Sequence, residues 1–512
     1  MSRIAVIAAV AAAGLVASAV PASTEARVAA PTSSGPVPVV VSPPPGTSTT
    51  PAPPAISSPV VQVTATAAAR HSLPTGYYGI NFDYDSLASF PGFGGFDSDL
   101  AALQPGTLRY PGGTGANWFR WRLGYPENAP GPSCSPQQAS CVTFTLADLL
   151  AAYRATGATP IFDLNVMTST LDNQIAMLQD ARSLGLPVVD VELGNELYLG
   201  NPSYVSHFPN PRSYGLRVAA YVKALHADFP GVTVAAVGAL RTNTEREKNW
   251  NRVVLNVAQR HHGLPDAITL HEYEPAKTAL TRAGLPALFD EPYTGVREID
   301  TALSRLPVAR PAWITEYNLS PAHPANSNPA ERTFAQALFA AEMDLLAPTA
   351  GGAQLIDYWT SFGAGVDNAY GGSGPALTPS GRALEWVDQA AACATTSSQI
   401  TFAGGPALPG GAEPALIGRV YSNGTPAQHE VLLNLSAQGA VVHSGSAVPA
   451  GQPYRQGAGA PIAPMSTAGQ MSVTTGTTGR TVTLPPYSIT QLGLGPAFLC
   501  PGTPIMRPIP HG

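Results

Sequence analysis

The chain has few charged residues and very few lysines. Only 12% of its 512 residues are charged, three of these are lysines, and the formal net charge is −6. This composition leaves no basic patch for nucleic acid and no polybasic segment for a membrane surface. After the first twenty residues, the chain has no apolar run long enough to cross a bilayer. We therefore expect neither a nucleic-acid-binding protein nor a membrane-spanning one.

Cysteine is also scarce, and its spacing matches no zinc-binding pattern. Cys134 and Cys141 are close enough for a small disulfide loop, and Cys393 and Cys500 could then enclose the C-terminal region. Four cysteines allow three pairings, among which the sequence does not choose. The first predicted strand is not followed by G-x-G-x-x-G, so a nucleotide-binding fold is not favoured. No metal and no cofactor is predicted.

The N-terminal residues have the layout of a secretory signal. Arg3 precedes an apolar stretch, Ile4 to Val16, and Ala17-Ser18-Ala19 is a plausible cleavage site. A membrane anchor is the alternative, but the apolar stretch is short for a membrane span. Residues 1–19 are thus predicted to be a signal peptide of a secreted protein, and the Pro/Ser/Thr-rich residues 20–59 a flexible linker.

From His71 the pattern changes to short apolar runs that alternate with amphipathic stretches, which is typical of parallel strands joined by helices. The eight predicted strands are Tyr78–Phe82, Thr107–Tyr110, Thr159–Asn165, Val188–Leu193, Val232–Val237, Ala267–His271, Ala312–Thr315 and Ala353–Tyr358. Predicted helices include Leu146–Thr156, Leu171–Leu184, Pro211–Asp228 and Ala330–Leu346. This pattern predicts an α/β fold, a (β/α)8 TIM barrel over residues 71–390, with a doubly wound open sheet as the alternative.

The last hundred residues show a different pattern. Short runs with two-residue alternation are separated by Gly- and Pro-rich turns, which predicts an antiparallel β-sandwich over residues 397–500. The strand at residues 60–66 is expected to join this domain rather than the barrel. Residues 501–512 are predicted to form a loose tail.

Polar and aromatic residues lie at or just after the predicted barrel strands, where TIM barrels carry their active sites. These residues are Asn81, Arg109, Asn195, Glu196, His271, Tyr273, Glu316 and Trp359. Glu196 and Glu316 follow the fourth and seventh strands, which face each other across a barrel mouth. Glycoside hydrolysis needs two carboxyl groups on either side of the scissile bond. The two glutamates are therefore the predicted reaction centre.

Other residues are predicted to support this pair. A buried guanidinium needs a partner, and Arg109 is expected to pair with Glu316, with Asp163 as the alternative. Glu192 lies within the fourth strand and is interpreted as a buried, hydrogen-bonded support. Strand alternation places His271 and Tyr273 on the site-facing side of their strand.

Further residues are candidates for sugar contacts. Asn195 is expected to bond a sugar hydroxyl next to the reacting carbon. Tyr198, Tyr317, Trp359 and Tyr370 are candidate apolar platforms for sugar faces, although aromatic residues at such positions are often packing residues.

The combination of Leu193-Gly194-Asn195-Glu196, Glu316, Arg109 and His271/Tyr273 resembles the retaining glycoside hydrolases of clan A. It is most similar to glycoside hydrolase family 79, the heparanase and β-glucuronidase group, with families 39 and 51 as rivals. The resemblance covers residues 76–384. It implies that Glu196 is the acid/base and Glu316 the nucleophile. One segment departs from family 79, because Pro321 stands where a uronate-binding tyrosine is expected.

The resemblance implies a hydrolase of β-glycosidic bonds, with glucuronides among the candidate substrates, acting on oligo- or polysaccharides by double displacement. An arabinofuranosidase or xylosidase of the same clan, a transglycosylase, and a non-catalytic polysaccharide-binding barrel are the alternatives. In a retaining enzyme, the two carboxyl groups should lie about 5–5.5 Å apart.

Overall fold

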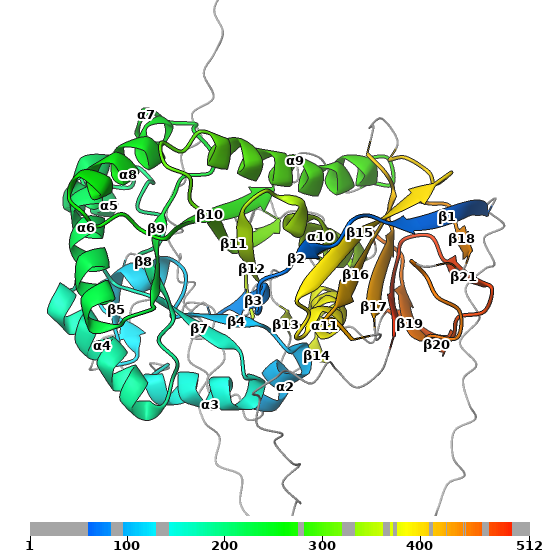
Figure 1. Ribbon diagram of the computed structural model, residues 1–512, viewed down its shortest axis with the longest axis horizontal. Coiled ribbons are helices and arrows are strands. Elements are labelled where there is room, and N and C mark those ends of the chain that lie inside the picture. The colour runs from blue at the N-terminus through cyan, green and yellow to red at the C-terminus, as the bar shows by residue number, and fades with distance from the viewer. Residues whose placement is uncertain are drawn as a thin grey trace, which may run out of the picture. The chain divides into compact units, whose positions relative to one another are not determined.

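The computed structural model describes residues 60–82, 96–129, 143–274, 281–319, 333–361, 369–371, 376–408, 413–425, 428–443, 445, 447–462 and 471–493 (Figure 1). The predicted signal peptide, linker and tail lie outside the described residues, as do Cys134, Cys141, Cys500 and Pro321. Cys393 is disulfide-bonded. Among the described residues, no helix is long and apolar enough to cross a membrane.

Eight parallel strands form a closed barrel, so the predicted TIM barrel is confirmed and the open sheet is excluded. The order around the barrel follows the chain, and β12 pairs with β3 to close it. The strands are β3 (Tyr78–Asn81), β4 (Thr107–Tyr110), β7 (Thr159–Asp163), β8 (Asp190–Leu193), β9 (Thr233–Val237), β10 (Ala267–Glu274), β11 (Ala312–Leu319) and β12 (Ala353–Tyr358).

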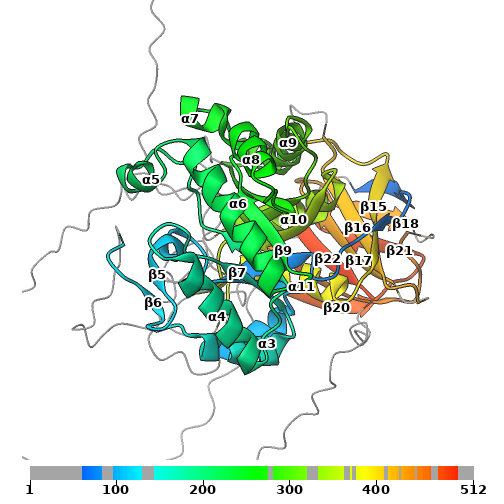
Figure 2. The same cartoon turned by 60° about the vertical axis from the view of Figure 1, so that its left-hand side comes forward.

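Helices cover the outside of the barrel (Figure 2). They are α2 (Phe96–Leu103), α3 (Leu146–Thr156), α4 (Leu171–Leu184), α5 (Pro202–His207), α6 (Pro211–Asp228), α7 (Glu245–Lys248), α8 (Trp250–Arg260), α9 (Leu285–Ser304), α10 (Phe334–Leu346) and α11 (Pro379–Ala391). Local signals set several helix ends. Thr145 forms a capping box with Asp148 before α3, and Gly157 and Gly185 end α3 and α4 in the left-handed conformation.

The barrel interior is filled in layers, because alternate residues of each strand point inward. Near the N-terminal ends of the strands, five strands contribute one residue each to a small apolar cluster. The cluster contains Ile161, Ala235, Ala267, Trp313 and Leu355. Two residues further along, the inward positions of four of these strands are polar and buried, namely Asp163, Thr269, Thr315 and Asp357. The interior thus changes from apolar to polar towards the C-terminal rim.

Gly79 occupies an inward position at which a side chain would not fit. A Cβ atom there would lie 1.9 Å from Oγ1 of Thr107 and 2.2 Å from Oδ1 of Asp357. The space is needed by these two residues, since Thr107 donates a 2.6 Å hydrogen bond to Asp357.

Strands β10 and β11 continue three and four residues beyond their predicted ends. They pair with each other along this extension, but the register shifts, because Leu270 faces Ile314 whereas His271 faces Glu316. Thr315 is therefore an extra residue in β11, which defines a β-bulge.

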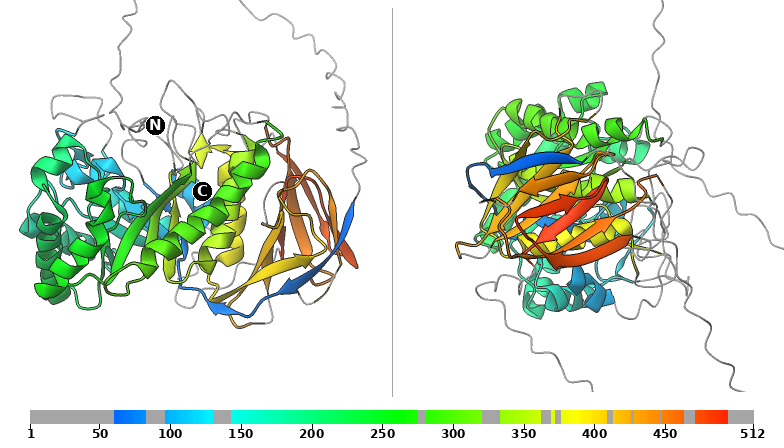
Figure 3. Two further views of the ribbon diagram at one scale, coloured as in Figure 1. Left: turned by 90° about the horizontal axis from the view of Figure 1, so that it is seen from above. Right: turned by 90° about the vertical axis from the view of Figure 1, so that its right-hand side faces the viewer.

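Ten further strands form one antiparallel-dominated sheet that encloses a second core (Figure 3). Its members are β1 (Val61–Ala67), β2 (His71–Ser72), β15 (Thr396–Ala403), β16 (Leu416–Ser422), β17 (His429–Asn434), β18 (Ala440–His443), β19 (Pro453–Ala458), β20 (Ser472–Thr477), β21 (Thr481–Leu484) and β22 (Ser488–Leu492). β1 pairs with β15 and β18, so the strand that precedes the barrel in sequence belongs to this sheet.

Buried hydrogen bonds join the sheet to the barrel. Tyr78 of β3 and Tyr421 of β16 have hydroxyl groups 2.9 Å apart, and the Tyr78 hydroxyl also donates to the carbonyl of Asp344. Arg419, which is buried, donates to the carbonyl of Leu345 at the end of α10. The sheet therefore contacts the outer helices, while the rim of the barrel remains the place where strand ends converge.

Candidate active site

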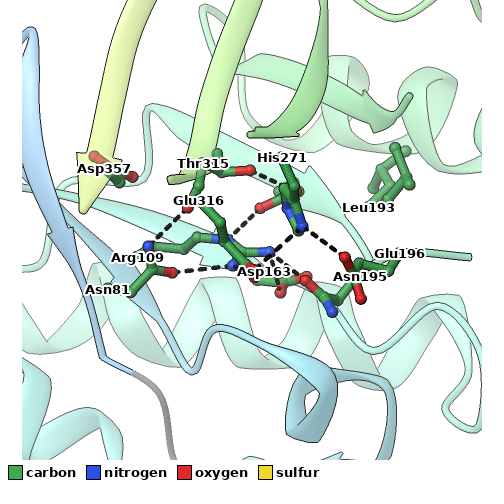
Figure 4. Close-up of polar contacts among 12 residues, drawn as sticks. Asn81, Arg109, Asp163, Leu193, Asn195, Glu196, His271, Thr315, Glu316 and Asp357 are labelled. Carbon is green, nitrogen blue, oxygen red and sulfur yellow. Dashed lines mark hydrogen bonds and ion pairs between the residues drawn. The ribbon is translucent and has the colours of Figure 1, made fainter. Parts of the chain in front are cut away.

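Arg109 of β4 is the centre of a buried polar network (Figure 4). Its guanidinium is fully buried and donates to three carboxylates, Glu192 at 2.6 Å, Glu316 at 2.6 Å and Asp163 at 3.1 Å. It also donates to the amide oxygens of Asn81 and Asn195. The two partners weighed from the sequence, Glu316 and Asp163, are thus both bound, because a guanidinium offers five N–H donors in a rigid fork.

Glu192 and Asn81 lie below the rim and hold the network together. Glu192 accepts hydrogen bonds from Arg109 and from the Thr315 hydroxyl. Asn81 donates to the carbonyls of Thr315 and Tyr358. Both side chains are fully buried and engaged by protein groups, so they lie in supporting positions rather than at the open rim.

Glu316 has a donor on each carboxylate oxygen. Oε1 accepts from Arg109, and Oε2 accepts a 2.6 Å hydrogen bond from the Tyr273 hydroxyl. Its side chain is 4% exposed. A carboxylate held in this way is oriented and keeps its charge compensated, as a nucleophile requires.

Glu196 follows β8 in a left-handed conformation, with φ of 49°. This backbone is uncommon for a residue other than glycine. It lies in a turn in which Gly194 also has positive φ and Asn117 bonds both the N–H and the carbonyl of Asn195. Tyr198 donates to Oε1 of Glu196. The turn thus directs the carboxylate towards Glu316.

His271 lies between the two glutamates. Its Nδ1 atom is 3.2 Å from Oε1 of Glu196 and 3.2 Å from Oε2 of Glu316. One side-chain nitrogen or oxygen atom from each of these three residues lies within 4.8 Å of the other two. Strand alternation placed His271 and Tyr273 on the same side of β10, and in the structure both contact the carboxylate pair while Glu272 and Glu274 point the other way, to Arg241.

The pKa values of these three groups are coupled through His271. Burial lowers the pKa of His271, but the charges of Glu316 and Glu196 outweigh burial and raise it. Burial raises the pKa of Glu196, yet the hydrogen bond and charge of His271 bring it below its ordinary value. Burial also raises the pKa of Glu316, and His271 and Arg109 offset only part of this rise. These directions favour a protonated imidazole beside an ionised Glu196.

A divalent cation could in principle be held by Glu196, His271 and Glu316. Both oxygens of Glu316, however, already accept from Arg109 and Tyr273, and the guanidinium lies 2.6 Å from one of them. A metal ion bound there would be repelled by this fixed positive charge. The donor set therefore fits proton sharing and carboxylate chemistry better than metal binding.

Tyr317 does not face the site, and the prediction that it forms a sugar platform is wrong. Its side chain is 1% exposed, and its hydroxyl donates to Asp344 of α10 at 2.6 Å. The β-bulge explains this position. Thr315 and Glu316 both point inward, so the next residue points outward, whereas regular alternation from Trp313 would have turned Tyr317 inward.

The other aromatic candidates occupy different positions. Trp359 directly follows β12 at the rim and is partly exposed. Tyr198 is partly buried, with its ring against Trp250 and its hydroxyl on Glu196. Tyr370 lies on the short strand β13 (Tyr370–Gly371), and its side chain is outside the described residues.

Asn117 is a site residue that the sequence did not indicate. It lies in the short 3-10 helix Thr114–Trp118 after Gly112-Gly113, and it pairs with the backbone of Asn195 as a neighbouring strand would. Asn195 in turn is 1% exposed, with its amide oxygen on Arg109. A contact across 78 residues leaves no local pattern, so no sequence signal could have identified Asn117.

Comparison of the sequence with protein-family models finds no match, and comparison with curated proteins finds none either. Solved structures of other proteins do resemble the structure of this chain. An α-L-arabinofuranosidase from Thermotoga maritima is 16% identical, with a TM-score of 0.61, covering 85% of this chain and 99% of that one. A family 51 α-L-arabinofuranosidase from Bifidobacterium longum has a TM-score of 0.64 at 16% identity, again covering 85% of this chain and 99% of its own.

A third similar structure is a 4-O-α-L-rhamnosyl-β-D-glucuronidase from Fusarium oxysporum. It is 12% identical, with a TM-score of 0.60, and the match covers 85% of this chain and all of that one. At such identities the similarity establishes the fold, a TIM barrel with an attached β domain. Family 51 was one of the rivals derived from sequence, and these similarities do not single out family 79. The chain thus shares its fold with these three enzymes, and Glu196 and Glu316 lie close together at the ends of its barrel strands.

Proposed function

We propose that this protein is a retaining glycoside hydrolase. The observation that carries the proposal is the close approach of Glu196 and Glu316, whose facing oxygens lie within 4.8 Å of each other. Retaining enzymes have carboxyl groups about 5–5.5 Å apart, whereas inverting enzymes leave about 6.5–9.5 Å for a water molecule. The spacing here supports direct attack on the sugar by one carboxylate.

The surroundings of the two glutamates support different roles for them. Glu316 receives Arg109 and Tyr273, which stabilise its ionised form, so we assign it as the nucleophile that attacks the anomeric carbon. Glu196 then protonates the glycosidic oxygen as the bond to the leaving group breaks. In the second step, Glu196 accepts a proton from the water that displaces Glu316 from the anomeric carbon.

The proton for the first step comes from the pair of Glu196 and His271. Nδ1 of His271 and Oε1 of Glu196 are 3.2 Å apart, so a proton can be shared between them. An imidazolium beside a carboxylate carries the same number of protons as a neutral imidazole beside a carboxylic acid. The lowered pKa of Glu196 and the raised pKa of His271 describe where that proton resides within the pair. The pair as a unit therefore supplies the acid.

The charge of the site favours a neutral sugar. Three buried carboxyl groups and the partly exposed Glu196 lie around one guanidinium and one imidazole, and Arg109 donates to side-chain oxygens of five residues of the protein. The described part of the site has no cation left for the carboxylate of a uronic acid. We therefore propose neutral glycosides as substrates, with α-L-arabinofuranosides as the first to test, because two of the similar structures are named for that activity.

Export from the cell, expected from residues 1–19, is part of the same proposal, since an exported enzyme meets oligo- and polysaccharides outside the cell. It is tested by finding the mature protein, cleaved near Ala19, in the medium of producing cells.

A panel of 4-nitrophenyl glycosides tests the activity. We expect release of nitrophenol from α-L-arabinofuranoside and none from β-D-glucuronide, and no turnover of any sugar by Glu316→Ala. Proton NMR of the first-formed product should show retention of anomeric configuration. Hydrolysis by Glu316→Ala at the wild-type rate, or inversion at the anomeric carbon, would contradict the proposal, and glucuronide turnover alone would contradict the substrate class.

A further inference from the structure

The last part of β10, which carries His271 and Tyr273, has a paired strand on one side only. On the side of β11, pairing continues from Ile268 to Glu274. On the side of β9, pairing ends at Thr269, whose carbonyl accepts from the N–H of Gly238 (Figure 1). A strand edge that has lost its neighbour is held less firmly unless another group takes over the hydrogen bonds.

Arg241, three residues after Gly238, occupies the position of the missing strand. Its Nη1 atom donates a 2.6 Å hydrogen bond to the backbone carbonyl of Tyr273. Its Nη2 atom donates to Glu272 at 2.6 Å and to Glu274 at 3.3 Å. A single side chain thus binds three consecutive residues of β10 from the side that β9 has left.

Arg241 is itself fixed from a second element. Its Nε atom donates a 3.0 Å hydrogen bond to Glu298 of α9, so the guanidinium links the loop after β9, the end of β10 and a helix. Because Glu272 and Glu274 point away from the barrel interior, the two carboxylate contacts form on the outer face of the strand, opposite to the Tyr273 side chain, and the third contact reaches the Tyr273 carbonyl at the strand edge. The Arg241 side chain is about one-third exposed and has no contact with the two site glutamates among the residues described.

We propose that Arg241 is a positioning residue, which holds the end of β10 so that Tyr273 and His271 reach the two glutamates. The proposal rests on the proposed glycosidase function for its catalytic consequence, but its structural content is independent of it. The hydroxyl of Tyr273 lies 2.6 Å from Glu316 and His271 lies 3.2 Å from both glutamates. A shift of β10 by a fraction of an ångström would therefore weaken all three contacts together.

The charges around Arg241 suit this role. Glu272 and Glu274 are buried, and Glu272 lies against Gly295 of α9, where a side chain on the glycine would crowd its carboxyl group. Burial and a hydrogen bond with Glu272 raise the pKa of Glu274 to about 10, which favours its neutral form. Arg241 then compensates the negative charges of Glu272 and Glu298. Because its planar guanidinium has several N–H donors, it also donates to the Tyr273 carbonyl.

Arg241→Met tests the proposal, with Glu298→Gln as the matched control, because the control removes the charge of another partner of the same guanidinium without touching β10. We expect Arg241→Met to lower kcat about ten- to a hundredfold with little change in KM, and to move the acid limb of the pH profile to higher pH. Arg241→Lys, which keeps the charge but lacks the fork, should recover only part of the loss. Glu298→Gln should stay within about twofold of wild type.

A double-mutant cycle identifies the route of the effect. If Arg241 acts through Tyr273, the double variant Arg241→Met/Tyr273→Phe should be scarcely slower than the slower single variant. Fully multiplicative losses would overturn the proposal, as would wild-type kcat and pH profile in Arg241→Met.

Hydrogen exchange of the backbone, read by mass spectrometry, tests the structural part without any substrate. In Arg241→Met, amides of residues 270–274 should exchange at least tenfold faster, while those of β8 are unchanged. Unchanged exchange in β10, or faster exchange across the whole barrel, would refute the positioning role. If exchange changes as expected but no glycoside is hydrolysed by wild type, the proposed function fails and the role of Arg241 in holding β10 stands.

Discussion

The hydrogen bond from Tyr273 to Glu316 gives the sharpest test of the site, and Tyr273→Phe removes it with little change in shape. The bond is 2.6 Å long and its acceptor has a side chain only 4% exposed, so water cannot easily replace the lost donor. This bond lowers the pKa of Glu316, whose burial acts in the opposite direction. Without it, the carboxylate should take up a proton at higher pH and lose its nucleophilic form earlier on acidification.

The expected size follows from the kind of bond. Hydrogen bonds to charged groups contribute about 1.5–3 kcal/mol, which corresponds to roughly ten- to 150-fold in rate on the acid side of the profile. The sign is fixed, because the nucleophile must be ionised and the substitution favours its protonated form. The acid limb of kcat/KM should therefore move to higher pH, and activity at pH values above the limb should change less.

The measurement is kcat/KM against pH for wild type, Tyr273→Phe and the control Tyr317→Phe. The control removes a hydroxyl from the residue next to the nucleophile, but that hydroxyl donates to Asp344 outside the barrel. We expect its acid limb to coincide with that of wild type. An acid limb that stays in place or moves to lower pH in Tyr273→Phe would refute the reasoning, as would an equal shift in the control.

Three further substitutions have defined outcomes. His271→Gln should move the acid limb to higher pH, because His271 lowers the pKa of Glu316, and the basic limb to lower pH, because the pair with Glu196 then lacks the imidazole whose raised pKa retains the shared proton; an unmoved profile would contradict this. Burial raises the pKa of Asp344, so wild type loses stability as pH rises above the ordinary carboxyl range, and Asp344→Asn should be more stable in urea at pH 7.5 with the gain vanishing near pH 4. Gly79→Ala should lower the free energy of unfolding by about 1–3 kcal/mol, since its Cβ would overlap Thr107; an unchanged thermal midpoint would contradict the packing argument.

The barrel could be predicted because its elements carry local signals. α3, α4 and α6 begin and end at the predicted residues, where capping residues, Pro at the start and Gly at the end mark the helix boundaries. β4 and β12 also match, because they are short apolar runs between turns. The extension of β10 was missed, since Glu272 and Glu274 do not look like strand residues. Their burial depends on Arg241, and this contact leaves no trace in the local sequence.

The network around Arg109 shows a second limit of local reasoning. A buried guanidinium needs a partner, and the sequence offers Glu316 or Asp163 for this role. In the structure, Arg109 binds Glu316, Asp163 and Glu192 at once. Such sharing follows from the geometry of a closed barrel, in which inward residues of several strands meet at one level. The sequence identifies the candidate partners of Arg109, but it does not show at which height along the barrel axis each side chain lies.

The opposite outcomes for Glu316 and Tyr317 have a single cause in the β-bulge at Thr315. Trp313 points into the barrel, so regular alternation would direct Thr315 and Tyr317 inward and Glu316 outward. The extra residue lets Thr315 reach Glu192 while Glu316 reaches Arg109, and it turns Tyr317 out to α10. The need for two carboxyl groups identified Glu316 despite the alternation rule, whereas the prediction for Tyr317 took no account of a bulge. The bulge is therefore the local feature on which the position of the proposed nucleophile depends.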